Sequence, residues 1–234
     1  MYPATQKLET MIKRQQIRQY LQNQRLNAER DKYLQALRAR AKISVRLQPL
    51  PPLRVEVSVS GTPPFKGVEK APVTIIKFED FQCPFCRQTQ ATFTQLEARY
   101  GNKIKVVHRD FPIDKSHPQA RRAAEGARCA NEQGKFWQYH DKLYATNLTA
   151  DPKQLSALAK EIGLDLASFD RCLANGQYKA LVQKDLEEGK KLGVTATLAF
   201  FINGRVIVGA QPLESFARII DEELAGGTAN AGSR

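Results

Sequence analysis

The first forty or so residues have the hydrophobic pattern of an amphipathic helix. There is no Gly or Pro from about Thr5 to Lys42, and most residues there are strong helix formers. The polar stretch Gln22–Arg25 interrupts the apolar stripe, so one helix or two are possible. A single helix would be roughly 57 Å long, and we expect a second copy or a partner to cover it unless it is only partly ordered. Apolar residues recur at the helical spacings of three and four, at Ile17, Tyr20, Leu21, Leu34, Leu37 and Ala41.

A proline-rich stretch, residues 48–72, separates this arm from the rest of the chain. Five prolines precede Gly67 and one, Pro72, follows it. Polar and apolar residues alternate at Arg54–Ser58, which predicts a short strand at the edge of a sheet. We interpret the stretch as a linker that carries one edge strand.

The pattern after the linker is that of a mixed α/β domain. Two apolar runs predict buried strands, and the segment between them predicts a helix with Pro84 in its first turn, which together make a βαβ unit. Helical patterns follow, and then a β-hairpin with Asn203–Gly204 at its turn and a last helix. The strands are expected at 73–81, 103–111, 197–204 and 205–210, and the helices at 84–100, 120–132, 135–146, 152–162, 166–173, 178–191 and 212–224.

The order of these elements predicts the fold class. A βαβ unit, a series of helices and a final ββα unit are typical of an α/β, thioredoxin-like fold with an inserted helical domain, here preceded by an N-terminal helical arm. We expect a basic helical arm at 1–47, the linker at 48–71, the thioredoxin-like domain at 72–225 with its insert at about 113–192, and a disordered tail at 226–234.

The positive charge of the chain is concentrated in the arm. Residues 1–50 hold eleven Lys and Arg against three Asp and Glu, so they carry +8 of the net charge of +12. Such a segment can bind nucleic acid or an anionic membrane, but no zinc-finger or RNP-type motif accompanies it. We interpret it as a solvated helix and expect no nucleic-acid partner. No apolar run is long enough to cross a bilayer, so we expect no membrane span.

Two features of the sequence bear on the compartment. The start of the chain lacks the apolar segment of a signal peptide, which leaves open a leader that has been removed or a cytoplasmic protein. The four cysteines, Cys83, Cys86, Cys129 and Cys172, permit two disulfides, which hints at an oxidising compartment.

Cys83 and Cys86 form a single CxxC motif within FEDFQCPFCRQTQ, residues 78–90. Structural zinc sites need four ligands, commonly from two paired motifs. Neither of the other two cysteines has a partner two residues away, and the three histidines are not at metal-binding spacings. We therefore expect one chain alone to bind no metal and no cofactor, and we interpret His117 and His140 as capping or core-edge residues.

A reactive pair of cysteines fits this motif better than a metal site. Cys83 immediately precedes a predicted helix, where unpaired N–H groups and the helix dipole favour a thiolate. Since the thiolate is the attacking species, we expect Cys83 to be the exposed nucleophile. Cys86 lies one turn further on and can resolve a mixed disulfide. Pro84 limits the freedom of the turn, and Phe85 offers an apolar contact to an unfolded client.

Several segments of the chain together resemble one known family. FEDFQCPFC, HRDFP, AEGARCANEQGKFWQYHDKLY, FDRCLANGQY and GVTATLAFFINGR are similar to the DsbA-like thiol–disulfide oxidoreductases over about residues 70–225. The resemblance implies a thioredoxin fold with a helical insert, a reversible Cys83–Cys86 disulfide and an exported, usually periplasmic, location. It also implies that clients dock at Pro84, Phe85, Thr197 and Leu198.

The chain departs from the family pattern at two positions. The buried acidic residue that usually lies six positions before the first active-site cysteine is replaced by Lys77, and a buried unpaired Lys is costly, so it would be neutral or point outward. The usual Thr-Pro pair, with a cis proline, is replaced by Thr197–Leu198. A cis bond before a non-proline residue costs about 2.5–4 kcal/mol, so we expect this loop to be trans or remodelled and client docking to be weaker.

The two remaining cysteines, Cys129 and Cys172, lie in different helices of the predicted insert. The resemblance implies that they form a stabilising disulfide. The alternative is two buried free thiols that pack as small apolar residues.

These observations lead to one functional hypothesis and two alternatives. We expect an oxidase or isomerase that exchanges disulfides with cysteines of exported proteins, works with a redox partner protein, and assembles into a homo-oligomer through the arm. One alternative is a chaperone-like holdase with impaired redox activity. The other is a metal or iron–sulfur protein in which two chains share their CPFC thiolates.

Overall fold

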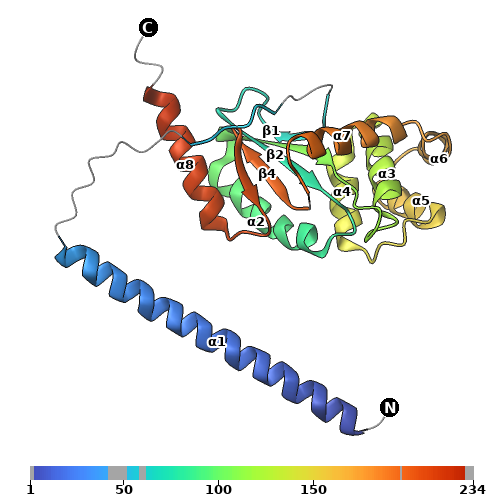
Figure 1. Ribbon diagram of the computed structural model, residues 1–234. Coiled ribbons are helices and arrows are strands. Elements are labelled where there is room, and N and C mark those ends of the chain that lie inside the picture. The colour runs from blue at the N-terminus through green and yellow to red at the C-terminus, as the bar shows by residue number, and fades with distance from the viewer. Residues whose placement is uncertain (1–2, 42–51, 58–61, 196, 230–234) are drawn as a thin grey trace. The chain divides into compact units, whose positions relative to one another are not determined.

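The computed structural model describes residues 3–41, 52–57, 62–195 and 197–229. The chain divides into two compact units, residues 1–51 and 52–234. The first unit contains a single helix, α1 (Pro3–Arg40) (Figure 1). The polar interruption does not divide this helix, because three of its four residues, Gln22, Gln24 and Arg25, are good helix formers. In the described part of the chain the large apolar side chains of α1 remain 40–66% exposed, namely those of Ile17, Leu21, Leu26, Tyr33, Leu34 and Leu37.

The second unit is built on one five-stranded sheet. Its strands are β1 (Phe65–Gly67), β2 (Val73–Glu79), β3 (Ile104–Asp110), β4 (Ala199–Ile202) and β5 (Arg205–Val208), in the spatial order β1-β3-β2-β4-β5 (Figure 1). Only β2 and β3 are parallel among these neighbours, and helix α2 (Pro84–Tyr100) joins them. A short 3-10 helix, Gly101–Lys103, leads into β3.

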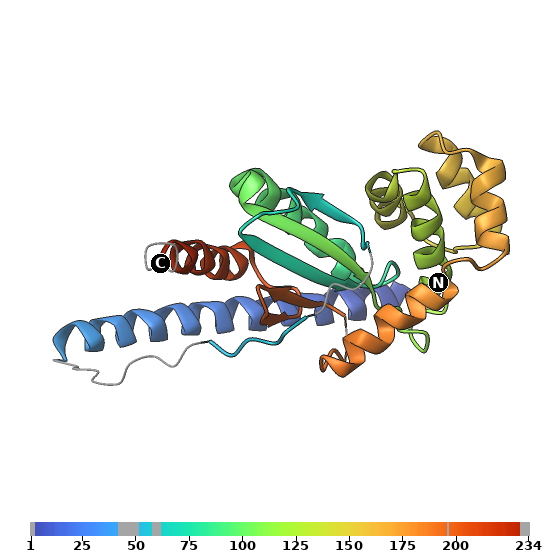
Figure 2. The ribbon, with the colours of Figure 1, turned by 90° about the horizontal axis from the view of Figure 1, so that it is seen from above.

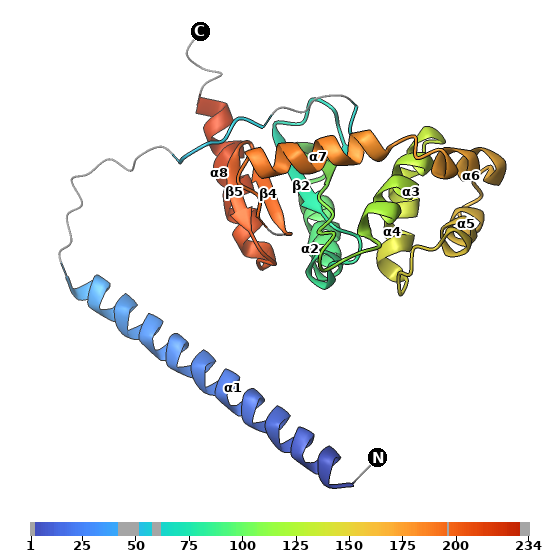
Figure 3. The ribbon, with the colours of Figure 1, turned by 45° about the vertical axis from the view of Figure 1, so that its right-hand side comes forward.

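Alternate residues of the central strands enter two cores, one on each face of the sheet. Ile75 belongs to the core that contains residues of α2 and of α8 (Leu213–Ala229), whereas the adjacent Ile76 belongs to the core under α7 (Lys179–Lys191). Figure 3 shows α7 running across the strands. Helix α7 packs closely against Phe111 at Gly189, where an added Cβ would lie 2.7 Å from the Phe111 ring.

The helical insert lies beyond one end of the sheet (Figure 2). It contains α3 (Ala120–Glu132), α4 (Phe136–Ala145), α5 (Pro152–Glu161) and α6 (Leu166–Ala174). Asp151 and Asp165 cap α5 and α6 by accepting hydrogen bonds from backbone N–H groups. The Cys129–Cys172 disulfide joins α3 to α6.

The predicted fold class, and the strands and helices expected from residue 73 to residue 224, are confirmed with small shifts of their ends. The hairpin turn is also confirmed, since Asn203 and Gly204 have φ angles of 45° and 85°. Within the described residues no helix is long and apolar enough to cross a membrane.

The edge strand predicted at Arg54–Ser58 is wrong for residues 54–57, which form no strand; Ser58 lies outside the described residues. Val55 N donates to Gly204 O at 2.8 Å, and Arg54 pairs with Glu223. These contacts hold residues 54–57 beside the hairpin turn, although the residues do not form the regular backbone hydrogen bonds of a strand. The edge strand of this region is β1 instead.

The tail predicted to be disordered from residue 226 also differs from the structure. Helix α8 continues to Ala229. Each residue added to a helix that is already packed gains one backbone hydrogen bond, and a Gly costs only about 1 kcal/mol. Gly226 and Gly227 therefore do not end the helix. The remaining residues of the predicted tail, 230–234, lie outside the described residues.

Candidate functional site

The two cysteines of CPFC lie where β2 leads into α2. Cys83 is the N-cap residue of α2, and Pro84 is its first residue. Asp80 shapes the turn, because its Oδ1 accepts hydrogen bonds from Cys83 N (3.1 Å) and Gln82 N (2.8 Å). Asp80 N lies 3.4 Å from Cys86 Sγ and donates to it. The turn therefore places the Cys83 sulfur at the start of the helix, whereas the Cys86 sulfur lies in the interior and accepts a hydrogen bond from Asp80.

The second carboxylate oxygen of Asp80 ties this turn to the segment that follows β3. Asp80 Oδ2 accepts from Ile113 N at 2.8 Å and lies 2.9 Å from His117 Nδ1. His117 is thus a partner of the active-site turn. Sequence reasoning did not assign Asp80 a role, although it lies within the quoted FEDFQCPFC motif and aspartate is a common turn residue.

The two thiols have pKa values that move in opposite directions. A hydrogen bond from Cys86, helped by the Thr197 side chain and by backbone N–H groups of the helix start, lowers the pKa of Cys83 to about 5, against the opposing effect of burial. Burial raises the pKa of Cys86 well above its ordinary value, and the nearby Glu79 charge adds to this effect. At neutral pH the reduced site therefore holds a Cys83 thiolate next to a protonated Cys86.

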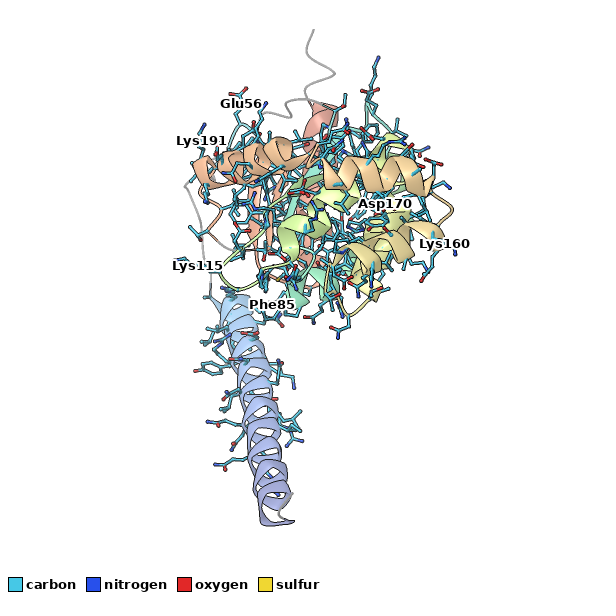
Figure 4. The ribbon with its side chains drawn as sticks, turned by 90° about the vertical axis from the view of Figure 1, so that its right-hand side faces the viewer. Glu56, Phe85, Lys115, Lys160, Asp170 and Lys191 are labelled. Atoms are coloured by element: carbon cyan, nitrogen blue, oxygen red, sulfur yellow. A yellow bond between two sulfur atoms is a disulfide. The ribbon has the colours of Figure 1, made fainter. Side chains whose placement is uncertain are left out.

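Cys83 is less exposed than the sequence led us to expect. It is 4% exposed and Cys86 is 0% exposed, and both are free thiols. The expectation of an exposed nucleophile is therefore wrong. Both cysteines belong to the same cluster of buried residues as Leu198. Apolar side chains therefore surround the two sulfur atoms and leave little of them accessible to solvent. The neighbouring Pro84 and Phe85 are exposed, and Phe85, which is 58% exposed, lies at the surface in Figure 4.

The expectation that the Thr197–Leu198 bond is trans is wrong, because this bond is cis in the structure. The expectation rested on the local preference of a bond without proline. In the folded chain Leu198 is 1% exposed, and its carbonyl accepts a hydrogen bond from Gly209 N at 2.9 Å, so tertiary contacts hold this loop. The weaker client docking expected from the sequence depended on a trans or remodelled loop, so we no longer expect it.

Lys77 is neither unpaired nor turned outward, which corrects the second sequence-based expectation. It is 1% exposed, and its Nζ lies 3.0 Å from Glu79 Oε1 and 4.3 Å from the centre of the Phe93 ring. Burial by itself would raise the pKa of Glu79, but the charge of Lys77 and the two nearby histidines, His108 and His140, hold it well below its usual range. A buried carboxylate is therefore present near the thiols, two residues after the expected position.

A further buried network holds the insert to the sheet. Arg128 on α3 binds Asp110 at 2.7 Å and Asp185 at 2.6 Å, and Arg109 of β3 binds Asp185 at 2.9 Å. Because these charges come from three elements, their pairing fixes α3 and α7 against β3. Breaking one partner of a buried pair is costly, so the network has a structural role.

Comparison with known proteins places the chain in a family. The pattern of the family described as Thioredoxin matches residues 59–222. Among solved structures, BdbD from Bacillus subtilis in its oxidised form has a TM-score of 0.68 and 22% identity, with 74% of this chain and 98% of that chain covered. The thiol-disulfide exchange protein alpha-DsbA2 from Wolbachia pipientis has a TM-score of 0.62 and 23% identity, covering 68% and 86%. A thioredoxin-like oxidoreductase from Silicibacter pomeroyi has a TM-score of 0.62 and 25% identity, covering 68% and 91%.

The curated relatives are much longer proteins. The chain is 34% identical over 161 residues to the Na(+)/H(+) antiporter NhaA 1 of Salinispora arenicola, which covers 69% of this chain but 24% of that protein. A similar match, 27% identical, is found to the antiporter NhaA of Herminiimonas arsenicoxydans. The chain thus spans about a quarter of the length of these relatives, and the match concerns only that part of them. From the family match and the shared fold, the chain belongs to the thioredoxin family and has the fold of the DsbA-type thiol–disulfide oxidoreductases.

Proposed function

We propose that this protein is a thiol–disulfide oxidoreductase that acts on cysteines of exported proteins, with Cys83 as nucleophile and Cys86 as resolving thiol. The observation that carries the proposal is the opposite shift of the two pKa values at the start of α2. Only one of the two sulfurs is a thiolate at neutral pH, so the order of attack is set.

In the reducing direction the Cys83 thiolate attacks one sulfur of a client disulfide. A Cys83–client disulfide forms, and the other client sulfur leaves as a thiolate. Cys86 then loses its proton and attacks the Cys83 sulfur, which forms the Cys83–Cys86 disulfide and releases the second client thiolate. The oxidising direction is the reverse of these steps.

The low pKa of Cys83 favours the oxidising direction. A stabilised Cys83 thiolate stabilises the reduced form of the enzyme, and a stable reduced form makes the disulfide form a stronger oxidant. The same thiolate is a good leaving group when a client thiolate attacks. We therefore infer an oxidase, or an isomerase if assembly through α1 brings several sites together, with a redox partner protein that restores the active form.

We infer that the client lies across the surface next to the nucleophile. Pro84 and Phe85 are exposed on one side of Cys83, and the side chain of Thr197 lies close to its sulfur. Leu198 supports this surface from the buried side. Phe85 can pack against apolar residues of an unfolded chain, which suits an enzyme that acts on proteins of many sequences.

Export and assembly are supported by separate observations. The Cys129–Cys172 disulfide suits an oxidising compartment, and a solved structure with this fold is described as a periplasmic thioredoxin-like protein from Salmonella enterica, with a TM-score of 0.57 and 21% identity. The exposed apolar side chains of α1 support a homo-oligomer formed through the arm.

The test is oxidation of a reduced, unfolded protein with several cysteines, together with the equilibrium reduction potential of the enzyme in glutathione buffers. We expect catalysed disulfide formation and a potential nearer that of an oxidase than that of thioredoxin. When mixed with a client that already contains disulfides, Cys86→Ser should trap a mixed disulfide as one client sulfur leaves as a thiolate, whereas the matched Cys83→Ser should trap none. If mixed disulfides accumulate instead through Cys86, the assigned roles are reversed. If neither thiol exchanges with the client, the proposal fails.

A further inference from the structure

Three side chains that can bind metal ions meet in the interior next to the active-site turn. They are Glu79 at the end of β2, His108 on β3 and His140 on α4. One possible ligand atom of each lies within 4.8 Å of the others. None of the three is more than 1% exposed. They are far apart in the sequence, so the absence of a metal-binding spacing along the chain does not describe their arrangement in space.

Two of the three distances between these atoms suit a four-coordinate metal ion. Glu79 Oε2 lies 3.1 Å from His108 Nδ1 and 3.5 Å from His140 Nε2. Ligand atoms of a tetrahedral zinc ion with bonds of about 2.0–2.1 Å are about 3.3–3.4 Å apart. The two observed separations lie on either side of this value.

Both histidines are oriented by a carboxylate on the side away from Glu79. His108 Nε2 lies 2.8 Å from Asp110 Oδ1, and His140 Nδ1 lies 2.7 Å from Asp141 Oδ1. When the outer nitrogen carries the proton and donates it to the carboxylate, the inner nitrogen keeps a free lone pair. Histidine ligands of metal ions are commonly held in this way.

The two oxygens of the Glu79 carboxylate also have different partners, as the two nitrogens of each histidine do. Oε1 lies 3.0 Å from Lys77 Nζ and 2.9 Å from Gln90 Nε2, which donate to it. Oε2 faces the two histidines. Each of the three possible ligands is therefore fixed by a second group, and the three remaining atoms lie within 4.8 Å of one another.

One buried atom of this cluster has no hydrogen bond within the described structure. His140 Nε2 is buried and unpaired, although it lies near Glu79 Oε2. Buried polar atoms without a partner are rare in folded proteins. A His108 imidazolium, with a proton on each ring nitrogen, can donate to Glu79 and Asp110 together, but it leaves His140 Nε2 without a partner. A cation bound between the three groups satisfies this atom as well.

One of the three possible ligands borders a cavity. The cavity has a volume of about 280 Å³ and is lined by His140 and Lys77, and its other lining residues include Lys66, Arg87, Gln90, Trp137, Asp141 and Tyr144. A water molecule from this cavity can occupy the fourth position of a site with three protein ligands.

We propose that Glu79, His108 and His140 bind one Zn²⁺ or a similar first-row divalent cation, without using the thiols of CPFC. The ligand set is two imidazoles and one carboxylate, which suits zinc or cobalt better than calcium or magnesium. The proposal goes beyond the thiol chemistry and does not depend on it.

The test uses untagged protein with Cys83→Ser and Cys86→Ser, so that neither thiol can bind the added ion. Zn²⁺ is titrated by calorimetry, and Co²⁺ is titrated by its visible absorption. We expect one ion per chain and the strong absorption of four-coordinate Co²⁺. Because the chain has three histidines, nitrogen NMR of labelled histidine can identify the ligands. The signals of His108 Nδ1 and His140 Nε2 should shift on addition of Zn²⁺, whereas those of His117 should not.

His140→Gln in the same background should weaken Zn²⁺ binding at least about tenfold, and His117→Gln serves as the matched control that keeps the affinity. If His140→Gln fails to fold, the histidine spectrum of the parent protein decides by itself. The proposal is overturned if neither ion binds at one per chain, if His117 is the residue that shifts, or if His140→Gln binds as tightly as its parent. Since the parent protein has no reactive thiol, none of these outcomes bears on the proposed redox function.

Discussion

Lys77 and Glu79 form an almost fully buried ion pair, with Nζ 3.0 Å from Oε1. The two residues lie on the same strand, two positions apart, so their side chains point to the same face of the sheet. Lys77 takes the position where the resemblance led us to expect an acid, and Glu79 supplies the acid two residues later. The thiols therefore have a buried negative charge nearby, and Lys77 compensates it.

We expect Lys77→Met to destabilise the protein strongly. The substitution keeps most of the side-chain volume but leaves Glu79 buried without its cation, which typically costs about 3–5 kcal/mol. Chemical denaturation at neutral pH, in the presence of a chelator, measures the loss. The matched control is Lys70→Met at an exposed position, which should change the free energy of unfolding by less than about 0.5 kcal/mol. Similar small effects at both positions would show that the buried pair does not stabilise the fold.

The low pKa of Cys83 predicts how the stability of the reduced protein depends on pH. Its pKa is lowered from 9.0 to about 5 on folding, so the unfolded chain binds the proton more tightly. The resulting stabilisation is fully present only above the unfolded value and is lost as pH falls through about 5. The free energy of unfolding of reduced protein, relative to Cys83→Ser, should therefore increase between pH 5 and pH 9.

Thiolate absorbance checks this pKa directly. It should show one group titrating near pH 5, and alkylation at neutral pH should modify Cys83 before Cys86. Cys86→Ala should raise the pKa of Cys83, because it removes the hydrogen bond that contributes most to the shift. An ordinary pKa at Cys83, or first modification at Cys86, would contradict the assigned roles.

We expect Asp80→Ala to lower the free energy of unfolding by about 3 kcal/mol or more. Asp80 is 1% exposed and accepts hydrogen bonds from Cys83 N, Gln82 N and Ile113 N. Hydrogen bonds to a charged group contribute about 1.5–3 kcal/mol each, and three backbone donors lose their acceptor together. The turn before α2 should also loosen, which would slow alkylation of Cys83 at neutral pH.

The control for Asp80 is Asp114→Ala, which removes an ion pair with Arg121 from a half-exposed position. Its effect should stay below about 1 kcal/mol. Chemical denaturation of both variants measures how much each substitution lowers the free energy of unfolding. Equal losses would mean that Asp80 does not organise the turn.

Removal of residues 1–47 should lower the oligomeric mass and leave the second unit folded. The reason is that α1 carries large apolar side chains that stay exposed in the described chain, whereas residues 52–234 form a compact unit of their own. Light scattering of both forms measures the mass, and circular dichroism measures the fold. In the full chain, Leu34→Glu with Leu37→Glu should have the same effect as the truncation. A full-length protein that is monomeric at micromolar concentration would leave the arm without a role in assembly.

Much of the secondary structure could be predicted from the sequence because it depends on neighbouring residues. The helix at 84–100 has the predicted bounds, since Pro84 marks its start and Gly101 follows its end. The Asn203–Gly204 turn follows from the φ angles that these residues adopt readily. The position of Cys83 at a helix start was likewise available from the CPFC segment alone, and the role that we propose for Cys83 rests on that position.

The tertiary structure decided the features that depend on residues distant in the chain. Sequence patterns could not show that Lys77 is buried against Glu79, that Leu198 is held in the core beside the cysteines, or that His108 and His140 meet Glu79. Propensity and periodicity report only on contacts within a few residues. Whether a buried charge finds a partner, or a loop takes an unusual geometry, depends on packing between β2, β3 and α4, and that packing is fixed only when the whole domain has folded.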